Sequence, residues 1–286
     1  MVIVLPIVKN RFFQLLLIVL LAILILSKVQ TPFSHQELYL EGEKYHLYYS
    51  HTQLFVDYKG TQYSLLLEEN EKIIDFSVGD IDSDGKDEVL TLVGNKGASY
   101  GNKLVIYDLL VNPNGLQIQE IYRNIISIIR PWKIETCEID NDDEPEIFIA
   151  VNKATHYYTG IENRPFFFNF KDGMLVKKWT GSKVRAPFTD LYFADINGNG
   201  SDEFIVIEES NDGRFVIAVY YWFGFGFVLQ AESDIYDAIS SVSVLKSDND
   251  VFLKAKVKED GKIRFVKLEP STDKTQNEIY LLKERR

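Results

Sequence analysis

The chain has 286 residues, of which 46% are hydrophobic, so it can bury a sizeable core but is too short for more than two ordinary domains. Its formal net charge is −11, whereas a nucleic acid needs a positive protein surface to meet its phosphates. The composition therefore argues against nucleic-acid binding and fits a surface that binds cations. The lone cysteine, Cys137, excludes a fold held by intrachain disulfides.

The first 30 residues have the pattern of a membrane-targeting segment. Residues 12–26 are almost all Leu, Ile, Val and Ala, and Lys9 and Arg11 precede them, which predicts a cytoplasmic N-terminus. No small-x-small cleavage motif follows the apolar run. We therefore predict an uncleaved transmembrane signal anchor in residues 1–30, a single-pass location in the cell membrane, and an extracellular domain in residues 31–286. The alternative, a helix buried in a soluble core, would normally keep a polar stripe.

Alternating apolar and polar residues follow the predicted anchor. They occupy residues 37–49, 54–58 and 63–67, and they predict strands of a degenerate first unit.

Three copies of one acidic motif come next and align without gaps. They are residues 79–88 (GDIDSDGKDE), 137–146 (CEIDNDDEPE) and 194–203 (ADINGNGSDE). Their first acidic positions, Asp80, Glu138 and Asp195, lie 58 and 57 residues apart. Such regular spacing indicates a structural repeat.

Strand-like runs flank every acidic motif. The leading runs are residues 74–78, 132–136 and 188–193, and the trailing runs are residues 89–93, 147–151 and 204–207. Further strand-like runs follow in each unit, and the tail adds four more at residues 239–245, 251–257, 262–268 and 278–282. A sheet of four short strands cannot bury both of its faces alone, so neighbouring units must stack. We therefore predict an all-β fold, a β-propeller-like ring of about five four-stranded antiparallel blades after one N-terminal transmembrane helix.

The three motifs resemble the FG-GAP or VCBS-type repeats of integrin-α-like β-propellers, whose blades carry an Asp-x-Asp-x-Asp-Gly-x-x-Asp calcium turn between their first two strands. The resemblance covers roughly residues 70–210 and implies a calcium-binding propeller. When the first acidic residue of each motif is counted as position one, the chain departs from that pattern in having Glu at the ninth position, at Glu88, Glu146 and Glu203. The chain is also too short for the seven blades common in the family.

Alternating carboxylate and amide oxygens, followed by a carbonyl and another carboxylate, suit the six to eight oxygen ligands of calcium. The predicted ligands of the first loop are Asp80, Asp82, Asp84 and Glu88, with the carbonyl of Lys86. Those of the third loop are Asp195, Asn197, Asn199 and Glu203, with the carbonyl of Ser201. Those of the second loop are Glu138, Asp140, Asp142 and Glu146, with the carbonyl of Glu144. We expect the calcium to be structural, and the second loop to be the weakest candidate because Asp143 replaces the turn glycine.

The motif has two other interpretations. An EF-hand needs a bidentate Glu at position twelve, where the first copy has Thr91. A hairpin turn without any metal stays open, because Asp, Asn and Gly are common in turns.

No reaction is predicted, since the four histidines have no ligand spacing and no catalytic cofactor is implied. Two long loops between second and third strands carry aromatic residues, namely Tyr100, His156, Tyr157 and Tyr158. Exposed aromatic side chains on a rigid scaffold are typical of recognition surfaces. The sequence therefore predicts an extracellular interaction module for a protein or glycan partner. The alternative is a carbohydrate-active enzyme, a glycosidase or lyase, that uses paired carboxylates on a propeller scaffold.

Overall fold

The computed structural model describes residues 34–50, 53–181, 183–247, 250–274 and 280–285. The described chain is built from β-strands, and its one helical element is the short 3-10 turn η1 (Ser127–Ile129). The predicted transmembrane segment falls outside the described residues. Within those residues, no helix has the length and apolar character needed to cross a membrane.

The first three sheets each contain four antiparallel strands in chain order. The first sheet contains β1 (Ser34–Leu40), β2 (Glu43–Ser50), β3 (Gln53–Tyr58) and β4 (Thr61–Leu66). The second contains β5 (Glu71–Gly79), β6 (Glu88–Asn95), β7 (Lys103–Asn112) and β8 (Gly115–Ile125). The third contains β9 (Pro131–Cys137), β10 (Glu146–Lys153), β11 (Glu162–Lys171) and β12 (Met174–Thr180). The predicted four-stranded antiparallel units are therefore confirmed.

The last two units are joined at their outer edges. The fourth unit contains β13 (Phe188–Ala194), β14 (Glu203–Glu209), β15 (Phe215–Trp222) and β16 (Phe227–Glu232), and the fifth contains β17 (Ala238–Ser247), β18 (Asp250–Glu259), β19 (Lys262–Lys274) and β20 (Tyr280–Glu284). The outer strand β16 pairs in parallel with β20, so that the two units form one eight-stranded sheet. The sequence does not predict this pairing.

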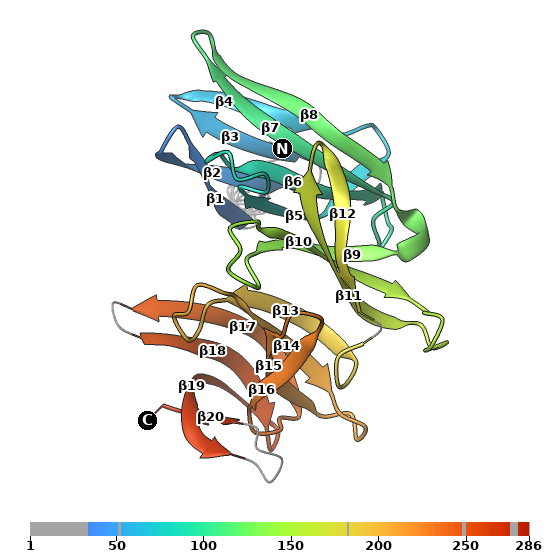
Figure 1. Ribbon diagram of the computed structural model, residues 1–286, viewed down its shortest axis with the longest axis vertical. Helices are drawn as coiled ribbons and strands as arrows, with labels where there is room; N and C mark the ends of the chain where they lie inside the picture. The colour runs from blue at the N-terminus through green and yellow to red at the C-terminus, as the bar shows by residue number, and fades with distance from the viewer. Residues whose placement is uncertain (1–33, 51–52, 182, 248–249, 275–279, 286) are drawn as a thin grey trace, which may run out of the picture.

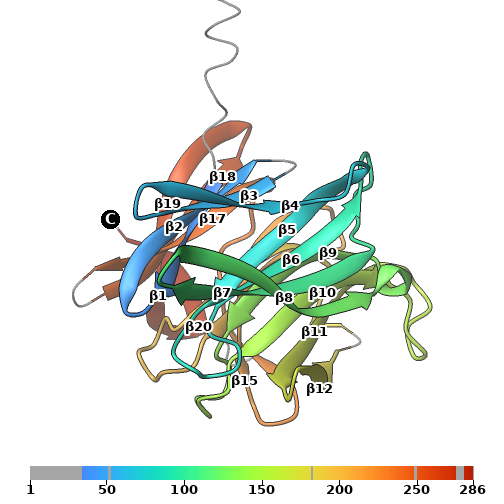
Figure 2. The same ribbon diagram turned by 90° about the horizontal axis from the view of Figure 1, so that it is seen from above.

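Successive units stack through apolar interfaces. Each of the four buried clusters joins consecutive units: first to second, second to third, third to fourth, and fourth to fifth. The first strands of neighbouring units, β1, β5, β9, β13 and β17, lie against one another, as inner strands of a propeller do. Figure 1 shows the first and second units in the upper half of the view and the fourth and fifth in the lower half, and Figure 2 shows the second and third sheets side by side. The described units thus form a propeller-like open arc.

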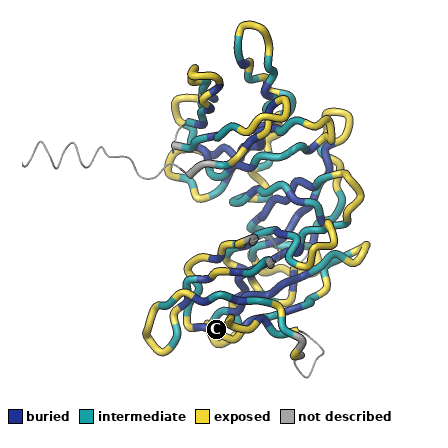
Figure 3. The backbone as a smooth tube through the Cα atoms, turned by 90° about the vertical axis from the view of Figure 1, so that its left-hand side faces the viewer, coloured by how far each residue is buried: buried dark blue, intermediate teal, exposed yellow. Residues whose placement is uncertain are grey.

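Burial along the strands follows from this stacking. Nearly every residue of the second strands β6, β10 and β14 is buried, because these strands are covered on both faces. Strands β8 and β12 at the outer edge are largely exposed or half-buried. Figure 3 shows buried segments running through the middle of the sheets and exposed segments at the hairpin ends.

The first unit differs from its prediction. The expected single run over residues 37–49 is two strands, β1 and β2, which pair as a hairpin. Glu41 and Gly42 form its turn, with φ values of 50° and 78°. Two consecutive left-handed residues are the geometry of a tight hairpin turn that matches the twist of the strands. The unit is therefore a complete four-stranded sheet.

Candidate functional site

The three acidic motifs form hairpin loops between the first and second strands of the second, third and fourth units. All three loops have the same backbone path. Two positions of each loop have a left-handed backbone conformation, counted from the first acidic residue. The fourth position is Ser83, Asn141 or Gly198, and the sixth is Gly85, Asp143 or Gly200. The repeat seen in the sequence is therefore a repeat of conformation as well.

The three loops also touch. The hydroxyl of Ser83 donates to the carbonyl of Asp143 at 2.8 Å. A Cβ placed on Gly200 would lie 2.7 Å from Oδ1 of Asn141, so a larger residue there would push the Asn141 side chain aside. The candidate sites thus form one continuous row.

A buried glutamate lies beneath each loop at the ninth position of the motif. Glu88, Glu146 and Glu203 are 2%, 0% and 1% exposed, respectively. One carboxylate oxygen of each accepts the backbone N–H of an isoleucine within its loop at 2.9–3.0 Å. Burial raises the pKa of Glu88 to about 8 and the pKa values of Glu146 and Glu203 to about 7. A nearby cation would stabilise the charged form of these carboxylates.

The first loop brings three of its predicted ligands together. One carboxylate oxygen each from Asp80, Asp82 and Glu88 lies within 4.8 Å of the others. Asp84 instead pairs with Lys86, whose Nζ lies 3.0 Å from Oδ2 of Asp84. Burial first, and then the charge of neighbouring acids, raises the pKa of Asp82. This is a concentration of negative charge that a divalent cation would neutralise.

Asp108 on β7 adds to that negative charge and was not predicted. Its carboxylate contributes to the raised pKa of Asp82, after burial and the closer acids of the loop. Strand pairing places it where the third sheet has Asn169. No motif in the sequence marks Asp108, since it lies outside the loop.

The second loop brings all four of its predicted acidic ligands together. They are Glu138, Asp140, Asp142 and Glu146, with one oxygen of each within 4.8 Å of the others. The ammonium group of Lys178 on β12 also lies here, at 2.8 Å from Oδ1 of Asp140 and 3.5 Å from Oδ2 of Asp142, and it forms an ion pair with Glu146. Lys178 was not predicted, because it lies on the fourth strand of the unit, outside the motif.

Glu144, the predicted carbonyl donor of the second loop, has a different partner. Its carbonyl accepts a hydrogen bond from Nδ2 of Asn169 at 3.0 Å, and its side chain pairs with Lys171.

The third loop has fewer charges. Asp195 accepts backbone N–H bonds from Gly198 and Gly200 at 2.6 and 2.9 Å. Burial alone would raise the pKa of Asp195, but these bonds outweigh it and hold the pKa below its ordinary value. Asn197 donates to the Glu203 carboxylate, which brings both residues to one place. Oδ1 of Asn199 accepts the N–H of Ser201 at 2.8 Å.

An aspartate at the eighth position ties two of the loops to the preceding unit. Oδ2 of Asp87 accepts the N–H of Tyr39 at 2.6 Å, and Oδ2 of Asp202 accepts the N–H of Glu138 at 3.0 Å. The N–H of Asp202 donates in turn to the carbonyl of Glu138 at 2.5 Å. The second loop has Pro145 at this position, which has no N–H to donate. The Asp-Glu pair that recurs at the end of the first and third motifs is the pattern from which this link between units could have been predicted.

The predicted aromatic face is partly exposed. Tyr157 is 83% exposed, and its ring contacts that of His156 with centroids 5.1 Å apart. The ammonium of Lys183 lies 4.6 Å from the ring centre of Tyr158. Tyr100 is half-buried, and the guanidinium of Arg130 lies 4.2 Å from its ring centre. Two of the four aromatic residues thus face basic side chains.

A separate group of charged residues lies on the inner strands. Lys133 on β9 lies 2.8 Å from Oδ1 of Asp190 on β13 and 3.7 Å from Oε1 of Glu135. Asp75 on β5 accepts the N–H of Ile134 at 2.8 Å. Burial raises the pKa of Asp75 to about 6 and that of Glu135 to about 7. Lys133 and Asp75 thus join the third unit to the fourth and to the second, respectively.

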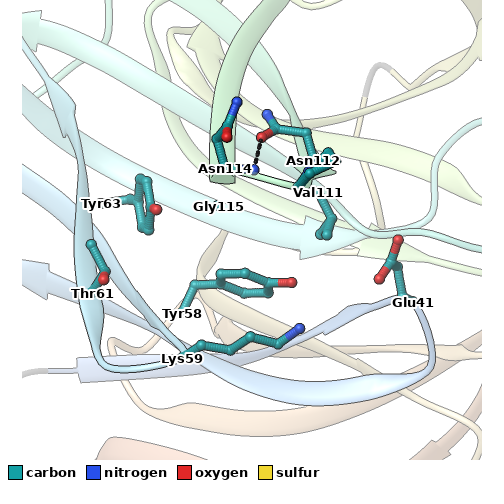
Figure 4. Close-up of a pocket in the computed structure, with 10 residues that line it drawn as sticks. Glu41, Tyr58, Lys59, Thr61, Tyr63, Val111, Asn112, Asn114 and Gly115 are labelled. Carbon is teal, nitrogen blue, oxygen red and sulfur yellow. Dashed lines mark hydrogen bonds between the residues drawn. The ribbon is translucent and has the colours of Figure 1, made fainter.

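A cavity of about 560 Å³ lies between the hairpins of the first two sheets. Figure 4 shows Tyr58 and Tyr63 on its one side and Asn112, Asn114 and Gly115 across from them, with the N–H of Asn114 bound to the amide oxygen of Asn112. Aromatic rings combined with amide groups are typical of sites that bind small polar ligands.

No protein-family model matches the sequence, and a search of curated proteins finds no match either.

Proposed function

We propose that the chain is a membrane-anchored extracellular module in which calcium ions fix the acidic loops of a propeller-like scaffold, and that the scaffold presents a surface to a protein or glycan partner. The observation that carries the calcium proposal is the first loop. There, carboxylate oxygens of Asp80, Asp82 and Glu88 converge within 4.8 Å, and the strongest charged neighbours of Glu88 are all acidic.

Calcium suits this loop better than magnesium does. The donors are carboxylate oxygens on a hairpin loop, and calcium accepts irregular coordination by six to eight oxygen atoms. Magnesium demands a near-octahedral shell and keeps several waters. The shared conformation of the three loops also supports membership of the FG-GAP or VCBS-type repeats, which the motif resembles.

Calcium titration of the full chain in detergent micelles tests this proposal. We expect binding heat and a higher melting temperature in calcium than in chelator, because a ligand at 100 times its dissociation constant stabilises the fold by about 2.7 kcal/mol. The double variant Asp80→Asn, Glu88→Gln should lose part of both effects. Asp212→Ala, in a hairpin outside the loops, is the control. A melt that chelator leaves unchanged, without binding heat, would refute the proposal.

The recognition surface is supported by the exposed ring of Tyr157 and by the neighbouring pair of Tyr158 and Lys183. Aromatic and basic groups together suit both glycans and acidic protein segments. Binding of the full chain to a glycan array and to cell-surface protein extracts tests the surface. The triple variant Tyr100→Ala, Tyr157→Ala, Tyr158→Ala should lose the captured partner. Phe265→Ala, which removes an exposed aromatic ring of the fifth unit, should keep it. Retained binding by the triple variant would rule this surface out.

The membrane anchor is supported by the apolar residues 12–26 and the basic residues before them. We expect the full chain to sediment with membranes and to resist carbonate extraction. A variant without residues 1–30 should stay in the supernatant. Equal partition of both forms would contradict the anchor.

A carbohydrate-active enzyme is the second candidate function. The observation that favours it is the inner-strand group, where Glu135 has a pKa raised by burial to about 7, as a general acid requires. Incubation of the full chain with a polysaccharide panel tests it. Release of sugar that Glu135→Gln abolishes would establish this function, and no release from any substrate would exclude it for that panel.

A further inference from the structure

Lys178 occupies the position in the second loop where a bound cation would lie. It approaches from β12, is 14% exposed, and contacts Asp140, Asp142 and Glu146. Glu146 is fully buried, and its second oxygen is held by the N–H of Ile139 at 2.9 Å. The ammonium thus supplies the positive charge that these carboxylates require.

The strand pairing shows which residues of the neighbouring units hold the position of Lys178. The pairing of β11 with β12 shifts by one residue between Phe167 and Phe168, and the residue passed over is Lys178. The same shift in the second sheet passes over Ile121, and in the fourth unit it passes over Gln230. Lys178, Ile121 and Gln230 therefore hold equivalent positions.

The two equivalent residues provide no charge to their loops. Ile121 packs against the apolar cluster between the second and third sheets. Gln230 lines a small cavity together with Asn197 of the third loop. The first loop has Asp108 where the second has the neutral Asn169, and it has Ile121 in place of a lysine on its fourth strand.

We propose that Lys178 is a tethered cation that replaces calcium in the second loop, and that the residue at this position of the fourth strand decides whether a loop takes a free divalent ion. The part that concerns the first and third loops rests on the calcium binding proposed above. The part that concerns the second loop does not, because it depends only on the contacts of Lys178.

The ammonium group of Lys178 lies among the oxygens predicted to hold calcium in the second loop, at 2.8 Å from Oδ1 of Asp140 and paired with the buried carboxylate of Glu146. A calcium ion bound by the same oxygens would lie within a few ångströms of this ammonium, and the two like charges would repel. Calcium could therefore enter only if Lys178 left.

Calcium titration of the full chain in micelles, with calcium chloride as the only added ligand, tests the inference. We expect Lys178→Gln, which introduces the residue found at position 230, to bind one more calcium ion per chain than the unmodified protein does. Lys178→Arg keeps the charge and should gain none. The reciprocal variant Ile121→Lys places a lysine beside the first loop and should bind one calcium ion fewer than the unmodified protein. This variant tests the inference if Lys178→Gln fails to fold.

The outcomes separate this inference from the proposed function. A folded Lys178→Gln chain that gains no calcium overturns the inference, even if the unmodified chain binds calcium. A gain in Lys178→Gln with no calcium bound by the unmodified chain supports the inference and refutes calcium binding by the first and third loops. An Ile121→Lys chain that keeps all of its calcium also overturns the inference.

Discussion

Single residues decide how well each acidic loop is made. The sixth residue of every loop is left-handed, which suits Gly85 and Gly200 but places Asp143 at a φ of 61°. A side chain in this region costs about 1–2 kcal/mol relative to the ordinary conformation, whereas glycine adopts it freely. Asp143 is also outside the group of carboxylates that gathers in the second loop.

We therefore expect Asp143→Gly to stabilise the protein by about 1 kcal/mol. The carbonyl that receives the Ser83 hydroxyl is unaffected by this change, because it belongs to the backbone. Thermal or urea unfolding measures the effect. Gly85→Asp, the reverse exchange in the first loop, should destabilise by a similar amount. Equal stability of Asp143→Gly and the unmodified chain would mean that the loop does not hold this conformation.

The inner-strand residue Glu135 makes stability depend on pH. Burial raises its pKa from 4.5 to about 7, so the folded state holds a proton that the unfolded chain has released. Its contribution to stability is complete below about pH 4.5 and is lost as the pH rises through about 7.

We expect the melting temperature of the unmodified chain to fall more steeply over that range than the melting temperature of Glu135→Gln. The difference should be on the order of 1 kcal/mol, since one unit of pKa shift corresponds to about 1.4 kcal/mol and the side chain is partly solvated. Melts at half-unit pH steps measure it. Parallel curves for the two proteins would contradict the raised pKa.

At the scale of strands and loops, hydrogen bonds between units supplement the apolar interfaces. Asp202 holds both backbone groups of Glu138 and so joins the fourth unit to the third. Its removal leaves the N–H of Glu138 without that acceptor, and an unpaired group of this kind costs about 1–3 kcal/mol when buried.

Asp202→Ala should accordingly lower the free energy of unfolding by about 1–2 kcal/mol. Urea denaturation at saturating calcium measures this loss apart from any change in metal binding. Asp212→Ala removes an exposed pair with Arg214 within one hairpin and should change stability by less than about 0.5 kcal/mol. Losses of equal size in the two variants would show that Asp202 does not link the units.

For the whole molecule, the arc of stacked units predicts how it unfolds. Each unit contacts its chain neighbours, which is the arrangement of a repeat protein with nearest-neighbour coupling. Phe204 lies at the centre of the interface between the third and fourth units, where its ring contacts Phe148, Phe167 and Phe193.

We expect Phe204→Ala to lower the free energy of unfolding by about 3–5 kcal/mol. Because the interface joins two groups of sheets, calorimetry should also show two transitions in place of one. The transition at the lower temperature would be the unfolding of the less stable group of sheets. Phe265→Ala, at an exposed position, should leave the melt nearly unchanged. A single transition at the original temperature would contradict nearest-neighbour coupling.

The sequence predicted the strands and the acidic loops, because each of these depends on residues that are close together in the chain. The strands around the acidic motifs are confirmed because alternation of apolar residues reports burial directly. Of the four acidic ligands predicted for the first loop, Asp80, Asp82 and Glu88 lie close together, whereas Asp84 pairs with Lys86. Lys178 and Asp108 were missed because they reach the loops across strands, and strand register cannot be read from one segment alone. The pairing of β16 with β20 was missed for the same reason.

That pairing has a consequence for solubility. An unpaired outer strand offers a row of free N–H and C=O groups on which another chain can add a strand, and such edges promote aggregation. In the fourth unit β20 pairs with the last two residues of β16, Ala231 and Glu232, and β16 carries a single charged residue, Glu232, to repel an incoming strand. Strands β8 and β12 are edges of their sheets and carry charges such as the pair of Arg123 with Glu120. Strand β20 thus closes one end of the apolar edge of the fourth unit to an incoming strand.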